Sequence, residues 1–285
     1  MRIATRGSPL ARWQAERVIE LVGEPAELVI VSTTGDHLKD TPIHAMGGTG
    51  VFVKEVQQAV LDGRADIAVH SAKDLPSERT PGLVIAAVPE RGDPRDALVG
   101  STLDDLRAGA VVATGSVRRR AQLAALRSDV GFADLRGNMQ TRLAKAAGFD
   151  AIVVAAAALD RLGLGDRIAE RLPTTQMLPQ IAQGALAVEC GEDDAVTHDR
   201  LAAIDSLDLH RAVDAERAFL AELGGGCDQP VGALAGIVAD GDVEIEGLIA
   251  SLDGRIVIRE SARDADAATA GRALAAAISY AVELT

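Results

Sequence analysis

The sequence predicts an α/β fold with two α/β domains around a cleft and a small α+β domain at the C-terminus. Short apolar runs alternate with helical patterns as far as Cys190, which is typical of α/β units with right-handed crossovers and largely parallel sheets. From about Asp208 the pattern changes to helix, strands and helix. A length of 285 residues also exceeds what one hydrophobic core usually serves, so we expect several domains.

Short β-branched or Ala-rich runs predict the strands of the first two domains. They are Arg2–Thr5, Glu27–Ser32, Asp66–His70, Leu83–Val88, Val111–Thr114, Ala151–Ala155 and Ala185–Cys190. Apolar residues at helical spacing predict the helices between them. These are Pro9–Leu21, Gly50–Leu61, Ser116–Arg127 and Met139–Ala147.

The last part of the chain predicts the third domain. A helical pattern from Asp208 to Leu223 is followed by three glycines, three strand-like runs and an Ala-rich helix. The runs are Gly232–Ala239, Val243–Ser251 and Arg255–Ser261. With the turn-rich segment Glu90–Pro94 as a crossing, we expect domain 1 at 1–93 with 185–204, domain 2 at 94–184 and domain 3 at 207–285.

Charge and composition limit the possible partners. The formal net charge of −13 disfavours nucleic acid and anionic membranes, so an anionic ligand needs a local cluster of cations. No apolar run reaches the roughly 18 residues of a membrane span, and no apolar segment opens the chain. We therefore expect a cytoplasmic protein, with Cys190 and Cys227 reduced.

Two turns place a hydroxyl, a glycine and arginines at a helix N-terminus. One is Thr5-Arg6-Gly7-Ser8, before Pro9, and the other runs from Thr114 to Arg119. Free backbone N–H groups and the helix dipole favour an anion at such a position. Plain helix capping by the two serines explains the same residues. The two interpretations stay open at this point.

An arginine-rich window follows the second turn. Between positions 118 and 142 the sequence has six arginines and two acidic residues. The arginines are Arg118, Arg119, Arg120, Arg127, Arg136 and Arg142. We expect Arg120 and Arg127 on a solvated helix face and the other four at helix starts. Arginine binds carboxylates and phosphates in planar, bidentate geometry, so the ligand should be polyanionic, of either chemistry.

A carboxylate and a thiol are further candidates. Asp74 lies in the run from His70 to Asp74 that follows a predicted strand, and an acid among cations stays ionised. His70 is more often a packed histidine than a base. Cys227 lies in a Gly- and Pro-rich loop and should be accessible, as a nucleophile, an attachment point or neither. Cys190 ends an apolar strand and indicates a core residue.

These segments together resemble porphobilinogen deaminases over nearly the whole chain. The matching stretches are Ile3–Ala11, Phe52–Glu55, Ala65–Asp74, Thr114–Arg119, Leu135–Asn138, and Gly225–Cys227 with Pro230. His-Ser-x-Lys-Asp followed by Gly-Gly-Cys at this separation is highly specific. One departure is Thr49, where the family commonly has a lysine before Phe-Val-Lys.

The resemblance implies a transferase that condenses four porphobilinogen molecules head to tail, releasing ammonia, to give hydroxymethylbilane. It implies a dipyrromethane cofactor on Cys227 through a thioether, an azafulvene from each substrate, and Asp74 as the catalytic carboxylate. It further implies cofactor contacts from Lys73, Ser116, Arg118, Arg119 and Arg136. The implied substrate contacts are Arg6, Ser8, Gln14, Ser71, Arg142, Arg161 and Gln183. No metal and a monomeric state are expected.

Two rival functions use the same features. A non-catalytic two-lobed anion-binding protein, similar in fold to periplasmic solute receptors, would use the arginines but would not need Cys227 or Asp74. The missing leader-like segment counts against it. A nucleic-acid binder conflicts with the acidic total and with an aromatic content of 2%.

Overall fold

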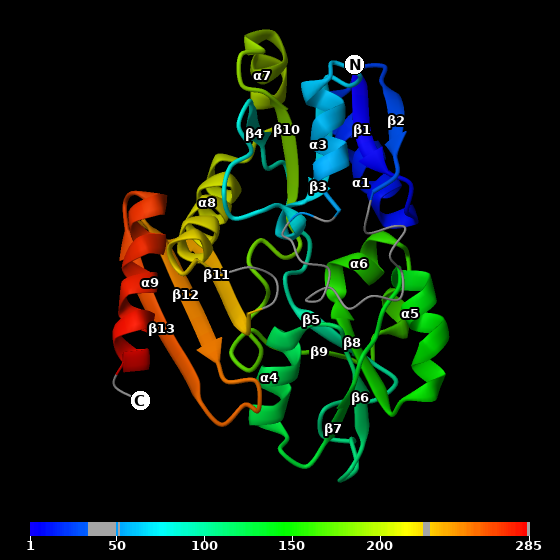
Figure 1. The fold of residues 1–285 in the computed structure, drawn as a ribbon, viewed down its shortest axis with the longest axis vertical. Coiled ribbons are helices and arrows are strands. Elements are labelled where there is room, and N and C mark those ends of the chain that lie inside the picture. Colours follow the sequence, from blue (N-terminus) through cyan, green and yellow to red (C-terminus); the bar gives the residue numbers. More distant parts are fainter. Residues whose placement is uncertain (34–49, 51, 225–228, 284–285) are drawn as a thin grey trace.

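The computed structural model describes residues 1–33, 50, 52–224 and 229–283, and its elements gather in three groups (Figure 1). Two groups each contain a five-stranded sheet, and the third contains a three-stranded sheet. The predicted fold class, with two α/β units and a small α+β unit, is confirmed. None of the helices within the described ranges is long and apolar enough to cross a membrane.

The first sheet has the strand order β2-β1-β3-β10-β4. The strands are β1 Arg2–Arg6, β2 Glu27–Val31, β3 Ile67–Ser71, β4 Leu83–Ala87 and β10 Leu186–Gly191. Its helices are α1 Pro9–Val22, α3 Lys54–Leu61 and α7 Ala195–Ala202. Ile3 packs with α1 and Ala4 packs with α3, because neighbouring side chains of a strand point to opposite faces. Both faces of this sheet are therefore covered.

The second sheet has the order β7-β6-β8-β5-β9. The strands are β5 Asp96–Val99, β6 Val111–Ala113, β7 Gly131–Ala133, β8 Ala151–Ala155 and β9 Glu170–Arg171. Its helices are α4 Val117–Leu126, α5 Met139–Lys145 and α6 Ala156–Arg161. Leu123 of α4 packs on one face, and Leu143 of α5 with Leu159 of α6 on the other. In the described part of the chain these groups also contain three short 3₁₀ turns: Ala72–Asp74, Ala146–Gly148 and Gly165–Arg167.

The prediction of largely parallel sheets is wrong for half of the strand pairs. Strand β1 pairs in parallel with β2 and β3, and β6 pairs in parallel with β7 and β8. Strands β10 and β5, however, run antiparallel to both of their neighbours. Each of these two strands arrives directly from the other sheet, so no crossover helix sets its direction.

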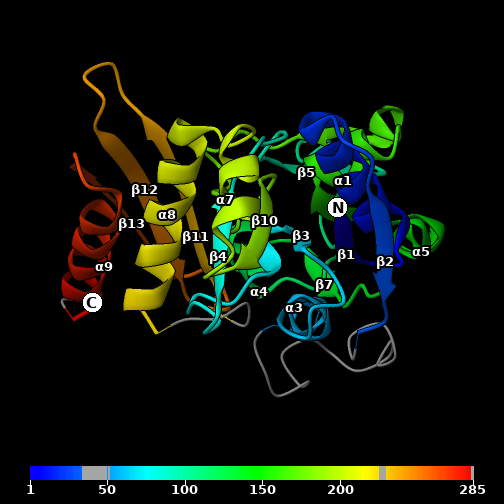
Figure 2. The same cartoon turned by 90° about the horizontal axis from the view of Figure 1, so that it is seen from above.

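The third group is an antiparallel sheet covered by two helices. The elements are β11 Val231–Ile237, β12 Val243–Ala250, β13 Val257–Asp264, α8 Leu207–Glu222 and α9 Ala267–Glu283. Phe219 of α8 and Leu274 of α9 are fully buried in one core with the sheet. Helices α8 and α9 lie side by side on the sheet, α8 over β11 and α9 over β13, and Figure 2 shows α9 on the outer side of the molecule.

Several elements differ from the prediction. Helix α3 begins at Lys54 rather than Gly50, because Gly50 has a φ of +78° and its carbonyl closes a turn onto Val53 and Lys54. Strands β5 and β9 and helices α6 and α7 were not predicted, and the strand-like run before Arg136 corresponds to β7. The elements that were not predicted have between two and eight residues, too few for periodicity to identify them.

Two segments connect the first and second sheets and lie against each other. Residues 88–95 lead from β4 to β5, and residues 172–185 lead from β9 to β10. The Gly92 amide donates to the Gly184 carbonyl over 2.9 Å, and the Leu186 amide donates to the Glu90 carbonyl over 3.1 Å. The predicted crossing Glu90–Pro94 lies in the first of these segments. The two segments position Asp96 and Gln183.

Candidate functional site

A short turn at the carboxyl end of β3 carries Lys73 and Asp74. The turn is a single 3₁₀ unit, Ala72–Asp74, because Pro76 prevents a longer helix. Gln14 of α1 donates to the Ser71 hydroxyl over 2.7 Å and fixes the start of the turn. Both charged side chains are half-buried. Within the described part of the chain, no hydrogen-bond partner is recorded for the Asp74 carboxylate.

The Asp96 carboxylate, fully buried at the start of β5, joins two arginines of α4. Arg118 Nη1 lies 2.8 Å from Asp96 Oδ2, and Arg119 Nε donates to Oδ1 over 2.9 Å. Burial opposes ionisation of Asp96, but the two guanidiniums outweigh it and hold the pKa of Asp96 well below its usual range. Asp96 therefore stays ionised and keeps both arginines at the N-terminus of α4.

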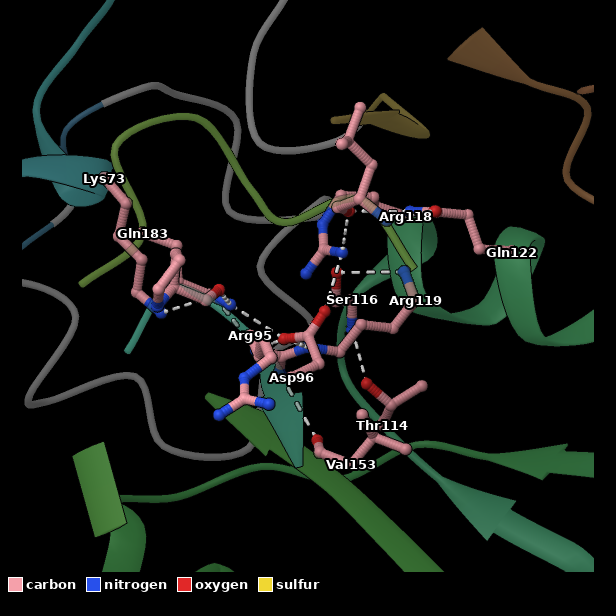
Figure 3. Close-up of polar contacts among 12 residues, drawn as sticks. Lys73, Arg95, Asp96, Thr114, Ser116, Arg118, Arg119, Gln122, Val153 and Gln183 are labelled. Atoms are coloured by element: carbon pink, nitrogen blue, oxygen red, sulfur yellow. Dashed lines mark hydrogen bonds and ion pairs between the residues drawn. The ribbon is translucent and has the colours of Figure 1, made fainter. Parts of the chain in front are cut away.

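The Gln183 side chain connects this triad to the turn of β3 (Figure 3). Its amide nitrogen donates to Asp96 Oδ1 over 2.9 Å and to the Pro94 carbonyl over 2.8 Å. Its carbonyl oxygen accepts from Arg119 Nη2 over 3.2 Å and from Lys73 Nζ over 3.3 Å. The amide thus holds cations from both sheets together.

The cations of the site repel one another in a partly buried environment. Burial, followed by the Arg119 charge, lowers the pKa of Lys73 to about 8. Burial, followed by the charges of Arg119 and Arg136, lowers the pKa of Arg142 to about 10. Burial likewise lowers the pKa of Arg136. Such shifts mark a site that lacks the negative charge needed to balance its cations.

Several guanidinium nitrogens of the site are buried without a hydrogen bond. Among the described residues, Arg118 Nε and Nη2 and Arg136 Nη1 have no partner. A buried charged donor left unpaired costs several kcal/mol, roughly, so an anion is the ligand that such groups favour. The site can therefore bind a polycarboxylate or polyphosphate through planar N–H pairs.

The serines at the two helix starts act as caps. Ser8 accepts from the Ala11 amide over 3.3 Å, and Ser116 accepts from the Arg119 amide over 3.4 Å. The capping interpretation is confirmed for both serines, although capping leaves their hydroxyls able to donate to a ligand. The prediction that both serines lie at helix starts is therefore confirmed.

Two more predicted arginines lie over aromatic rings. Arg6 lies 4.2 Å from the centroid of the Phe52 ring, and Arg161 lies 5.3 Å from that of Trp13. Arg161 also donates to the Gly184 carbonyl over 2.8 Å, so it contacts the segment that carries Gln183. The ring faces keep both guanidiniums oriented.

Other side chains test the remaining expectations. Arg120 is exposed, as expected, whereas Arg127 is only partly exposed. Arg127 donates to the carbonyls of Leu103 and Leu106 because the loop before β6 passes beside the end of α4. His70 is a packed histidine, buried 3.1 Å from Glu189. Cys227 and Thr49 lie outside the described residues.

Cys190 is the inert thiol that the sequence indicated. Its side chain is fully buried in β10. Burial raises the pKa of Cys190 to about 11, with Asp194 and Glu189 adding to the shift. The thiolate form is therefore scarce near neutral pH. Asp96, in contrast, was missed, and the only signal in the sequence was an acid directly before the apolar run 97–99.

Two family models match the chain. The model for "Porphobilinogen deaminase, dipyromethane cofactor binding domain" matches residues 1–199, and the model for the C-terminal domain matches residues 210–279. The chain belongs to the porphobilinogen deaminase family. Its dipyrromethane cofactor is the group that the first family model describes.

Named relatives agree with the family models. The porphobilinogen deaminase of Nitratidesulfovibrio vulgaris strain Miyazaki F is 44% identical over 292 residues, covering 99% of this chain and 92% of that protein. The porphobilinogen deaminase of Xanthomonas campestris pv. campestris strain B100 is 48% identical over 278 residues, covering 94% and 91%. The chain therefore spans nearly the whole length of both relatives.

Several solved structures are similar to the chain at low sequence identity. The VFT2 domain of BvgS from Bordetella pertussis matches 76% of this chain and 91% of that chain, with a TM-score of 0.40 and 18% identity. A YaeC-family lipoprotein from Enterococcus faecalis matches 73% and 91%, with a TM-score of 0.41 and 15% identity. The architecture is established by the strand pairing of the three sheets.

The described residues fit a dipyrromethane. Each pyrrole of this cofactor carries an acetate and a propionate, so the group is a tetracarboxylate. Arg118 and Arg136 present buried N–H groups without partners, and Lys73 and Arg142 have pKa values lowered by burial and by neighbouring cations. A tetracarboxylate would pair these donors and offset the repulsion among the cations.

The lowered pKa of Lys73 predicts a pH dependence. A lysine with a pKa of about 8 loses its charge on going from about pH 7 to about pH 9.5, and a carboxylate ligand then loses an ion pair. Cofactor assembly from porphobilinogen in cofactor-free protein should therefore slow across this range, as followed by intact mass. In Lys73→Arg the guanidinium stays protonated, so the profile, normalised to its own neutral value, should be flatter. Identical normalised profiles would contradict this role of Lys73.

Proposed function

We propose that this chain condenses four porphobilinogen molecules head to tail, with loss of ammonia at each addition, and releases hydroxymethylbilane by hydrolysis. The observation that carries the proposal is the set of buried guanidinium nitrogens of Arg118 and Arg136 that have no hydrogen-bond partner among the described residues. Arg142, whose pKa is lowered by burial and by Arg136 and raised by Asp74, connects these groups to the Lys73–Asp74 turn. Substrate, cofactor and growing product all carry an acetate and a propionate on each pyrrole. One cationic site can therefore bind all three.

The binding roles follow from the position of each cation. Lys73, Ser116, Arg118, Arg119 and Arg136 would hold the dipyrromethane, which supplies a nucleophilic pyrrole carbon when bound through Cys227. Substrate carboxylates would be bound and oriented by a second set of side chains. That set is Arg6, Ser8, Gln14, Ser71, Arg142, Arg161 and Gln183.

Asp74 would act on the reacting substrate. Within the described ranges its carboxylate accepts no hydrogen bond, and its charge acts on both Lys73 and Arg142, whose pKa values it raises against the effect of burial. As ammonia leaves the substrate, positive charge develops on the pyrrole nitrogen. A fixed carboxylate beside that nitrogen stabilises the charge more in the transition state than in the ground state.

We further propose that the enzyme works as a cytoplasmic monomer, with domain 1 at 1–93 and 185–204, domain 2 at 94–184 and domain 3 at 207–285. The sheet memberships of β1–β4 with β10, of β5–β9 and of β11–β13 support these limits. A purely anion-binding protein is not favoured. The family model and the named relatives support the enzyme. Anion binding alone would not need the Asp74 carboxylate.

The two cysteines provide a direct test of cofactor attachment. The intact mass of Cys227→Ser should equal that of the bare polypeptide, because the thioether cannot form, and the variant should lack activity. Cys190→Ser is the matched control and should keep the cofactor, because the Cys190 thiol is buried and unreactive. A Cys227→Ser protein that still carries dipyrromethane would overturn the attachment site.

Asp74→Asn tests the catalytic carboxylate. The change removes the charge at nearly constant size, so the cofactor should remain, whereas kcat should fall by about 100-fold or more. Glu78→Gln, an exposed acid four residues further along, is the control and should keep wild-type kcat. Steady-state kinetics with porphobilinogen measures both. Normal turnover by Asp74→Asn would mean that this carboxylate takes no part in the reaction.

A further inference from the structure

The carboxylate of Glu216 is fully buried and joins three separate parts of the chain. Glu216 lies in α8, and its oxygens accept from both terminal nitrogens of Arg91, over 2.6 and 3.2 Å. They also accept from the Ala182 amide over 2.5 Å and from the Ala235 amide of β11 over 2.8 Å. Arg91 and Ala182 belong to the two segments that connect the first and second sheets. Glu216 thus ties the third group of elements to both connections.

Arg91 extends this contact to Gln183. While the terminal nitrogens of Arg91 bind Glu216, its Nε donates to the backbone carbonyl of Gln183 over 3.0 Å. One guanidinium therefore spans the carboxylate of α8 and the backbone of the residue whose side chain enters the cationic site. A guanidinium can do this because its donors are fixed in one plane.

The backbone beside Gln183 is held in an unusual conformation. Ala182 has a φ of +57° and is the only non-glycine residue with a positive φ in the described ranges. This conformation is unfavourable for alanine and persists only where the surroundings impose it. The hydrogen bond from the Ala182 amide to Glu216 is one such constraint. On the other side, a side chain at Gly184 would collide with the Gly92 carbonyl.

Fixing the backbone on both sides determines where the Gln183 amide lies. That amide contacts Lys73, Asp96 and Arg119 (Figure 3). We infer that Glu216, acting through Arg91, is a positioning residue for Gln183 and so for the spacing of Lys73 and Arg119 in the cationic site. This inference rests on the proposed function of the site.

The position of α8 is thereby coupled to the site. Glu216 touches none of the side chains that would bind carboxylates, yet moving α8 would release Arg91 and the Ala182 amide together. A role in folding alone would change stability without changing how Lys73 and Arg119 are spaced. The two roles therefore give different kinetic results.

Glu216→Gln is the first variant, because glutamine keeps the shape of the side chain. It leaves one acceptor oxygen where the carboxylate offers two to Arg91 and to the two backbone amides. We expect kcat/KM for porphobilinogen to fall about 10-fold or more in the holoenzyme. Glu222→Gln, exposed at the end of the same helix, is the matched control and should be unchanged. If Glu216→Gln does not fold, Arg91→Lys replaces it, since an ammonium cannot span Glu216 and the Gln183 carbonyl in the same geometry.

A double-mutant cycle with Gln183→Ala separates positioning from folding. If Glu216 acts through Gln183, adding Glu216→Gln to Gln183→Ala should lower kcat/KM by less than about 3-fold further, because the link is already broken. Equal fold-changes in the two backgrounds, or no change in the single variant, would overturn the inference.

A second readout does not depend on turnover. The Gln183 side-chain oxygen accepts a hydrogen bond from the Lys73 ammonium and so favours its charged form. If Glu216→Gln displaces Gln183, the pH at which half of Lys73 has reacted with an amine-directed reagent should fall, as measured by peptide mass. An unchanged midpoint in Glu216→Gln would contradict the inference. Failure of wild-type protein and Glu222→Gln to consume porphobilinogen would instead refute the proposed function.

Discussion

The structure of the site depends on one carboxylate between two guanidiniums. Asp96 is fully buried, and without Arg118 and Arg119 its charge would be too costly to retain. The same contact holds both arginines at the N-terminus of α4 and gives the Gln183 amide an acceptor. Strand β5, helix α4 and the segment before β10 therefore meet at this carboxylate.

Asp96 and Asp74 together do not balance the cations around them. Lys73, Arg136 and Arg142 surround the triad and have pKa values lowered by burial. This explains how a chain with a net charge of −13 can bind a polycarboxylate: the cations gather in one partly buried site, where water screens them less than at the surface. The excess of positive charge also explains why, among the described residues, some N–H groups of Arg118 and Arg136 have no partner. Binding of the anionic cofactor then offsets the repulsion.

Local patterns in the sequence identified the parts of this site that lie on one segment. Pro9 after Ser8 and the hydroxyl of Ser116 mark helix starts, and both serines cap their helices. The arginine window and the run from His70 to Asp74 were likewise visible as patterns. Residues whose roles come from distant partners were not. Asp96 and Glu216 are acids in ordinary-looking segments, and only the fold brings them to Arg118 and Arg91. The antiparallel direction of β5 and β10 was not predicted for the same reason, because a strand's direction depends on the part of the fold from which the chain enters it.

The free energy of unfolding of Asp96→Asn tests the central role of this carboxylate most directly. The folded-state pKa of Asp96 is depressed, so its stabilising contribution is present above the unfolded pKa and is lost as the pH falls below about 4. Urea unfolding of the cofactor-free protein should show a loss of about 3–5 kcal/mol for Asp96→Asn at neutral pH, because two buried guanidiniums lose their counterion. The gap to wild type should narrow on acidification below about pH 4. A loss under about 1 kcal/mol at neutral pH, or a gap that stays constant with pH, would contradict the account.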